Sequence, residues 1–111
     1  MKLGVYNAIL HDRSLTEAIE TVKSLGLTGI EINSGGFLPA EHIPTYDQIL
    51  ESDVARDEFL GLFEGTGVDI AGLNCNGNPL HPNPTIGEKH GGDVVKSIRL
   101  AQRLGVKRLV T

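Results

Sequence analysis

The sequence lacks the features that tie a chain to an oxidising compartment, to nucleic acid or to a membrane. It contains a single cysteine, so an internal disulfide is excluded and a reducing compartment is expected. It has no lysine or arginine run and a net charge of -4, so nothing provides a basic footprint for nucleic acid. Its longest apolar stretches are strand-length, and no signal-peptide pattern is visible. These absences predict a cytoplasmic protein without a nucleic-acid or membrane partner.

The chain alternates strand patterns with helix patterns. Four short segments are predicted to be strands: residues 3–7, 29–33, 69–74 and 107–111. Helices are predicted over residues 14–25, 53–64 and 93–104, with a short helical turn near residues 46–50. This order, with crossovers of this length, predicts an α/β fold with a parallel sheet and right-handed connections.

The three main helices have local stop signals and apolar stripes. The spacing of Ser14 and Glu17 predicts a capping box, and Gly26 is placed for a left-handed cap. Gly65 and Gly105 are expected to end the other two helices. The predicted buried stripes are Leu15, Ala18, Ile19, Val22 and Leu25, then Ala55, Phe59, Leu62 and Phe63, and finally Val94, Val95, Ile98, Ala101 and Leu104.

Two parallel-sheet architectures compete for this pattern. An open doubly wound sheet normally has a glycine-rich phosphate turn after its first strand, but residues 7–12 contain no glycine. A barrel has long polar loops after every strand, and all three strand exits here are long and polar. We therefore predict the N-terminal half of a TIM (βα)8 barrel over residues 1–111, with three βα units and a fourth strand. A whole barrel needs roughly 250 residues.

Glu31 is the most informative polar residue on a predicted strand. It lies between Ile30 and Ile32, so it points away from the face that carries the isoleucines. A carboxylate inside a barrel needs an ionic or hydrogen-bonding partner. Glu31 is either part of a structural ion pair or a group that orients substrate, and both interpretations predict a partnered side chain.

The loop from Asn74 to Asn83 is the densest polar segment. Asparagine can donate to and accept from sugar hydroxyls, and His81 can bind substrate, move protons or ligate a metal. The same composition is also ordinary turn chemistry. His11 is a weaker candidate of the same kind, and Cys75 is expected to be a small filler.

The two remaining histidines give no further candidate for a binding or metal site. His42 and His90 are expected on surface loops. No spaced metal motif of histidines, carboxylates or cysteines is present in the sequence.

Several of these segments together resemble the sugar phosphate isomerase/epimerase family of xylose-isomerase-like barrels, which is related to the endonuclease IV fold. They are residues 4–7, the Gly-Ile-Glu-Ile strand at 29–32, residues 35–39, and the Gly-Asn-Pro-Leu-His-Pro segment at 77–82. The resemblance covers essentially the whole chain, but only the N-terminal half of a typical member. Relatives often have a histidine where this chain has Asn76, which weakens any claim of metal binding on this loop.

The resemblance implies a sugar isomerase or epimerase that moves a proton through an enediolate, aided by a divalent metal (Mn, Mg, Co or Zn). The usual metal ligands would lie beyond Thr111, so no catalytic or metal residue is assigned here, and the chain alone is expected to be inactive and to bind no metal. The resemblance implies a substrate-binding role for Glu31, Asn76, His81 and, less directly, His11. The expected partners are a sugar or sugar phosphate and, through bare strand edges, a second copy or a C-terminal half-barrel.

Two other functions are compatible with the same pattern. A metal-dependent abasic-site endonuclease has the same barrel, but the acidic balance and Asn76 disfavour it. A non-catalytic half-barrel could instead serve as an assembly module, with apolar side chains filling the pocket. Ketose binding would separate the isomerase from the module, and salt-dependent DNA binding would identify the nuclease.

Overall fold

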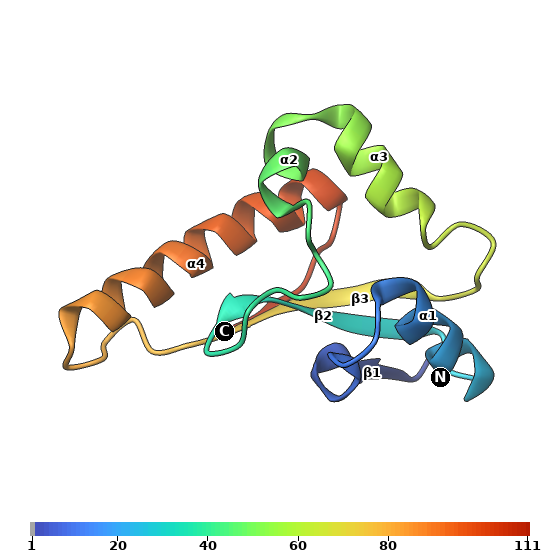
Figure 1. The fold of residues 1–111 in the computed structure, drawn as a ribbon, viewed down its shortest axis with the longest axis horizontal. Helices are drawn as coiled ribbons and strands as arrows, with labels where there is room; N and C mark the ends of the chain where they lie inside the picture. The colour runs from blue at the N-terminus through green and yellow to red at the C-terminus, as the bar shows by residue number, and fades with distance from the viewer. Residues whose placement is uncertain (1) are drawn as a thin grey trace.

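The computed structural model describes residues 2–111 and contains one four-stranded sheet (Figure 1). The strands are β1 (Gly4–Tyr6), β2 (Gly29–Gly36), β3 (Asp69–Asn76) and β4 (Leu109–Val110). They are all parallel and lie in the order β1-β2-β3-β4. The helices are the 3-10 helix η1 (Asn7–Leu10), α1 (Leu15–Ser24), α2 (Tyr46–Glu51), α3 (Asp53–Gly61) and α4 (Pro84–Leu104). The predicted α/β class with a parallel sheet is confirmed.

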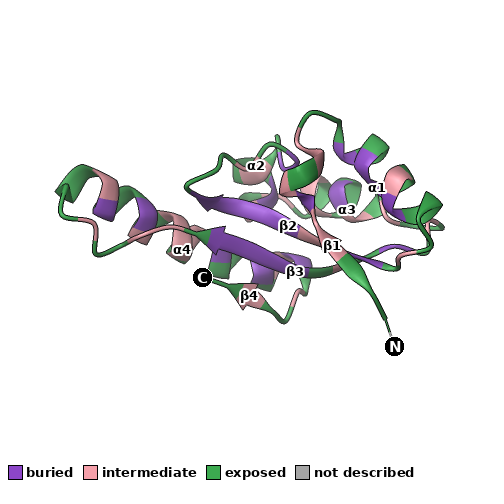
Figure 2. Ribbon diagram, turned by 90° about the horizontal axis from the view of Figure 1, so that it is seen from below, coloured by how far each residue is buried: buried purple, intermediate pink, exposed green. Residues whose placement is uncertain are grey.

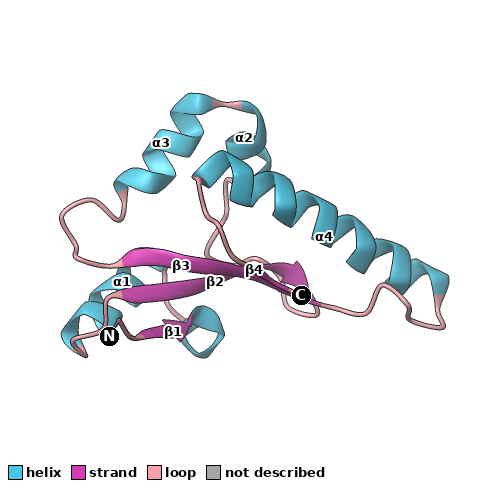
Figure 3. Ribbon diagram, turned by 180° about the vertical axis from the view of Figure 1, so that it is seen from behind, coloured by secondary structure: helices cyan, strands magenta, loops and turns pink. Residues whose placement is uncertain are grey.

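The hydrophobic core lies between the helices and one face of the sheet. Ile30, Ile32 and Leu73 supply the strand side of this core and are completely buried. Figure 3 shows α2, α3 and α4 on one side of β2 and β3, and Figure 2 looks at the strands from below, with the helices behind them. Burial of this apolar face is the main stabilising contribution, at roughly 25 cal/mol per Å². Among residues 2–111, no helix has both the length and the apolar character that a membrane crossing requires.

Helix α1 follows its sequence signals closely. The Ser14 hydroxyl accepts from the Glu17 backbone N–H at 3.2 Å, and the Ser14 N–H donates to the Glu17 carboxylate at 3.4 Å. Gly26 has φ +75°, as the left-handed cap requires. The predicted buried face is confirmed except for Leu25, which is 67% exposed because the helix ends one residue earlier and the chain turns away.

The predicted stripe of α3 is only partly correct. Phe59 is buried, and Ala55 and Phe63 are half-buried, but Leu62 is exposed. The helix ends at Gly61 rather than at the predicted Glu64, so Leu62 lies at its C-terminal cap. The short helical turn near residue 46 is confirmed as α2.

Helix α4 begins at Pro84, nine residues before the predicted start at Asp93. Asn83 caps it by accepting from the Thr85 N–H at 3.0 Å, and Pro84 occupies the first turn, where a missing N–H has no cost. Its buried face also differs from the prediction: Val95 and Ile98 are exposed. Ala101 and Leu104 are buried as predicted, and Ser97 and Leu100 complete the buried face of the helix.

Strand β2 extends beyond its predicted end at Asn33. Ser34–Gly36 was expected to be loop, yet Gly35 and Gly36 pair with β3 after a register shift that follows Asn33. Gly36 has φ +91°, and a Cβ there would lie 2.0 Å from the Asn76 carbonyl oxygen. Glycine is therefore required where the two strands approach each other at their carboxyl ends.

Candidate polar site on the uncovered face of the sheet

The face of the sheet opposite the helices carries a row of polar side chains. Register places Tyr6 of β1 beside Glu31 of β2, and Asn33 of β2 beside Asn74 of β3. Directly paired residues of parallel strands share a face, and Glu31 and Asn33 alternate with the buried isoleucines. Four polar residues from three strands therefore lie on one face of the sheet, with Tyr6 and Glu31 half-buried and Asn33 and Asn74 buried. Glu31 lies on the side opposite the isoleucines, as its position between them predicted.

Glu31 has a hydrogen-bonding partner on the neighbouring strand. The Asn74 side-chain N–H donates to a Glu31 carboxylate oxygen at 2.6 Å, and Glu31 is half-buried. This partner is a neutral amide rather than the cation of a structural ion pair. The carboxylate oxygens therefore keep acceptor capacity for a second donor, such as a hydroxyl group.

Asn74 was not among the predicted site residues, although it lies at the start of the polar loop that sequence reasoning singled out. Its side-chain oxygen is buried and has no hydrogen-bond partner within residues 2–111. Such orphaned acceptors are uncommon in folded proteins, and an ordered water or a donor from another segment commonly satisfies them. The signal that identifies Asn74 is its register with Asn33, which the sequence alone does not provide.

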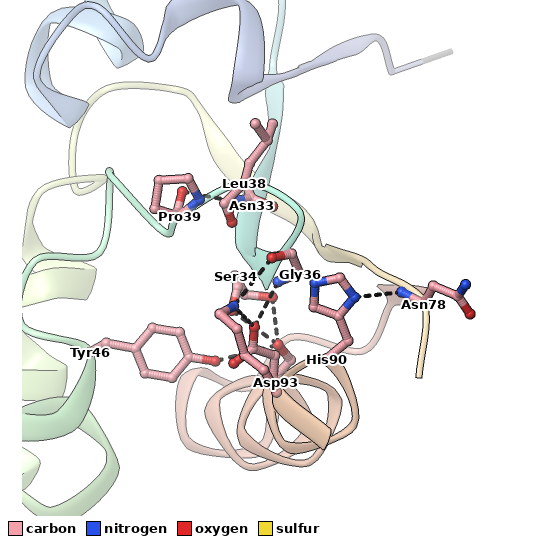
Figure 4. A network of polar contacts seen from close by, with 11 residues as sticks. Asn33, Ser34, Gly36, Leu38, Pro39, Tyr46, Asn78, His90 and Asp93 are labelled. Atoms are coloured by element: carbon pink, nitrogen blue, oxygen red, sulfur yellow. Dashed lines mark hydrogen bonds and ion pairs between the residues drawn. The ribbon is translucent and has the colours of Figure 1, made fainter. Parts of the chain in front are cut away.

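Asn33 and Tyr6 form the second pair on this face. The Tyr6 hydroxyl donates to the Asn33 side-chain oxygen at 3.2 Å. The Asn33 amide donates to the carbonyls of Leu38 and Pro39 at 3.1 and 2.9 Å (Figure 4). Burial, followed by the charge of Glu31, raises the pKa of Tyr6, so the phenol stays protonated as a donor. Asn33 thus connects β1 with the loop that follows β2.

His11, the residue that follows η1, lies beside a second histidine. Its ring packs edge-on against His42 with centroids 5.1 Å apart, and its Nε2 is buried without a partner in the described part of the chain. Burial, then the neighbouring His42, lowers the pKa of His11, while Glu41 opposes the shift. A neutral imidazole with an unpaired nitrogen can accept a hydrogen bond from a partner or donate one to it, depending on its tautomer.

The predicted loop residues lie apart from Glu31. Asn76 is exposed at the end of β3, and its carbonyl accepts from the Phe37 N–H at 2.7 Å. His81 is half-buried, and its Nδ1 accepts from the Asn83 N–H at 3.0 Å. In Figure 1 the segment around residue 81 lies at the far end of α4, beyond the sheet. None of the hydrogen bonds within residues 2–111 joins Glu31 to His81, so their shared cavity remains a prediction.

A separate polar network attaches α4 to the end of β2 (Figure 4). The Gly36 N–H and the Lys89 ammonium donate to the Asp93 carboxylate at 3.0 and 2.7 Å. Burial opposes ionisation, but these two donors hold the pKa of Asp93 below its usual range. Deeper in the interface, the Ser34 and Ser97 hydroxyls lie 2.8 Å apart. Each group has a protein partner, so this network fixes α4 in place.

Two histidines expected on surface loops are in fact buried. His42 is 2% exposed, and its ring nitrogens contact the Asn7 side chain and the Arg13 carbonyl. His90 lies in α4, accepts from the Asn78 N–H at 2.7 Å and packs edge-on against Phe37. Their partners come from distant segments, which a local reading of the sequence does not reveal. Burial raises the pKa of Cys75, which fits the expected filler better than a nucleophile.

The described residues do not fit the metal that the resemblance implies. Within residues 2–111, no three histidine, cysteine, aspartate or glutamate side chains are grouped so that they could hold an ion. The uncovered face offers one carboxylate, Glu31, whose closest partner is an amide. Any metal centre would therefore need ligands from other polypeptide segments.

Comparison with known proteins leaves the function open. No family model matches the chain. The chain is 33% identical over 110 residues to the uncharacterized protein YfiH of Bacillus subtilis (strain 168), a match that covers 99% of this chain. The same match covers 34% of that relative, so the chain spans about a third of its length.

Proposed function

We propose that this chain forms the first half of a (βα)8 barrel of the sugar isomerase/epimerase type, and that its uncovered sheet face binds the hydroxyl groups of the substrate. The observation that carries this proposal is the half-buried Glu31 carboxylate, which the buried Asn74 amide holds in place by a hydrogen bond. A carboxylate accepts hydrogen bonds, and hydroxyls are the donors that a sugar offers.

The sheet topology supports the barrel over an open doubly wound sheet. Strand order follows chain order, and the core joins the helices to a single face of the sheet. A doubly wound sheet has helices on both faces and reverses its strand order at the binding crevice. In a closed barrel the face opposite the helices points inward, which would place Tyr6, Glu31, Asn33 and Asn74 in the interior.

In this proposal the described residues bind and orient the substrate. Glu31 accepts from a substrate hydroxyl, and the Asn74 amide orients the Glu31 carboxylate by donating to it. The Glu31 negative charge favours a substrate without a carboxylate at that position. In enzymes of this type a bound divalent metal polarises the carbonyl and adjacent hydroxyl of the sugar. The proton-transferring groups and the metal ligands are assigned to other segments of the complete barrel.

Ligand-dependent NMR shifts test the binding part of the proposal. A panel of ketoses, with and without a terminal phosphate, is titrated into ¹⁵N-labelled protein. We expect shifts to concentrate at Tyr6, Asn33 and Asn74, and Glu31→Gln to weaken binding about tenfold, as the loss of one charged hydrogen bond implies. The matched control is Glu20→Gln, an exposed carboxylate of α1. Shifts confined to the helical side, or equal affinities for both variants, would sink the proposal.

Assembly is a second testable part of the same proposal. Within residues 2–111, β1 and β4 each pair with a strand on one side only. Such edges favour pairing with a further strand, from a second copy or from a C-terminal half-barrel. Light scattering after size exclusion should show an oligomer, and a stable monomer with exposed edges would count against this pairing.

A further inference from the structure

The uncovered face is linked to a buried histidine through a continuous chain of hydrogen bonds. The Asn33 backbone N–H donates to the Asn7 side-chain oxygen at 2.8 Å. The Asn7 amide nitrogen lies 2.8 Å from Nδ1 of His42, and Nε2 of His42 lies 2.8 Å from the Arg13 carbonyl oxygen. Asn7 and His42 are both almost completely buried, so neither can exchange these partners for water.

The direction of every bond in this chain is fixed by its two ends. A backbone N–H can only donate, so the Asn7 atom facing Asn33 is the oxygen and the one facing His42 is the NH₂ group. His42 Nδ1 must then accept. At the other end a carbonyl can only accept, so His42 Nε2 carries the proton. The network therefore assigns His42 to its neutral Nε2–H tautomer.

A second proton on His42 has no acceptor in this network. It would bring an N–H of Nδ1 against the Asn7 NH₂ group. Turning the Asn7 amide over would serve His42 but would set the NH₂ group against the Asn33 N–H. Either arrangement leaves a buried donor without an acceptor, which is costly.

The titratable neighbours of His42 come from its own loop, from the segment after β1 and from α3. The neighbouring histidine is His11, whose ring packs edge-on against His42. Two carboxylates, Glu41 from the same loop and Glu58 from α3, line the cavity that His42 also borders, about 430 Å³ in size. The Glu41 charge raises the pKa of His11 against the stronger lowering by burial and by His42. The hydrogen-bond chain opposes a second proton on His42.

We propose that His42, as the neutral Nε2–H tautomer, is a positioning residue that locks three segments around the sugar-binding face. It joins the β1 exit through Asn7 and Arg13, and it fixes Asn33 of β2 through Asn7. Asn33 in turn holds the carbonyls of Leu38 and Pro39 in the loop that contains His42. The sugar-binding part of this inference rests on the proposed function, whereas the tautomer and the lock do not.

The substitution Asn7→Asp gives the sharpest test, because it replaces the NH₂ group that faces His42 Nδ1 with an oxygen. The network then favours a proton on Nδ1, where the natural protein opposes one. One carboxylate oxygen would still accept from the Asn33 N–H, and the other would now accept from a protonated Nδ1. The ¹⁵N shifts of the His42 ring in labelled protein near pH 7.5 report both states. We expect one protonated nitrogen, Nε2, in the natural protein and two in Asn7→Asp. An Nδ1–H tautomer or a doubly protonated ring in the natural protein, or a neutral ring in Asn7→Asp, would overturn the assignment.

Substitutions of His42 itself test the positioning role. His42→Gln keeps a side chain with one donor and one acceptor, whereas His42→Leu removes both. We expect amide exchange at Asn33 to accelerate at least tenfold in His42→Leu and to be largely restored in His42→Gln. Unchanged exchange in a folded His42→Leu protein would contradict the lock. If that variant does not fold, the Asn7→Asp comparison still decides the tautomer.

Ketose titration of the same variants separates this inference from the proposed function. If the natural protein binds a ketose, His42→Leu should weaken binding and His42→Gln should recover most of it. Equal binding in all three would refute the link to the site. If the natural protein binds no ketose while the tautomer and exchange results hold, the proposed function fails and the lock stands.

Discussion

Ile32 and Asn33 are neighbours on β2, both are almost completely buried, and they face opposite sides of the sheet. Ile32 packs into the core beneath the helices, where contacts are interchangeable and non-directional. Asn33 is held instead by hydrogen bonds to Asn7, Tyr6 and the loop after β2. The first environment makes the chain fold, and the second specifies where polar groups point. Substitutions on the two faces should therefore differ in what they change.

The largest expected loss of stability is on the apolar face. Ile32→Ala removes a completely buried side chain and leaves a cavity, which typically lowers the free energy of unfolding by about 2–5 kcal/mol. Urea unfolding monitored by circular dichroism measures the change. Ile98→Ala is the control, because Ile98 is 53% exposed and should stay within about 0.5 kcal/mol. Similar losses for both would mean that the helices do not pack as described.

On the polar face, Asn33→Leu should lower the free energy of unfolding by less, about 1–3 kcal/mol. It keeps the size of the side chain but removes the acceptor of the Tyr6 hydroxyl and the donor to the Leu38 and Pro39 carbonyls. The same urea titration applies, together with amide shifts of residues 37–39. An unchanged loop, or a gain in stability, would show that these bonds do not hold the loop.

The sequence predicted the parts of the fold that depend on neighbouring residues. The α1 capping box, the left-handed Gly26 and the end of α4 at Gly105 follow from local chemistry, and all three are confirmed. The strand–helix alternation likewise predicts the parallel sheet. The polar face was anticipated at Glu31 because strand alternation alone separates it from the isoleucines.

The parts that were missed depend on contacts between distant residues. The predicted start of α4 at Asp93 missed its first turns, which begin at Pro84. A Cβ at Gly87 would lie 2.8 Å from the Pro79 carbonyl oxygen, so the preceding loop packs against these turns. His42 seemed to be on the surface because its partner Asn7 lies 35 residues away. Asn74 was overlooked because its role depends on register with β2.

Asn74→Ala should have a smaller effect on stability, at about 1 kcal/mol. It removes the bond to Glu31 but also removes a buried oxygen that has no partner in residues 2–111, so the two changes partly offset each other. Asn76→Ala is the control, because Asn76 is exposed. A double-mutant cycle with Glu31→Ala measures the coupling directly. A coupling near zero would mean that the two side chains do not interact in solution.

The smallest expected effect is a dependence of the free energy of unfolding on pH, which originates at His11. Burial lowers the pKa of His11 in the folded protein, so the unfolded chain takes up a proton first as the pH falls. The stability that His11 contributes is complete above about pH 6.5, the usual histidine value, and is lost as the pH falls through the lowered folded value. Urea titrations between pH 8 and 5 should therefore show a loss of stability that is smaller in His11→Phe, which keeps an aromatic ring against His42 but cannot be charged.

Since Glu41 opposes the shift of the His11 pKa, Glu41→Gln should enlarge the loss in the natural background and change nothing further in His11→Phe. Identical pH profiles for the natural protein and His11→Phe would show that the His11 ring is not buried beside His42.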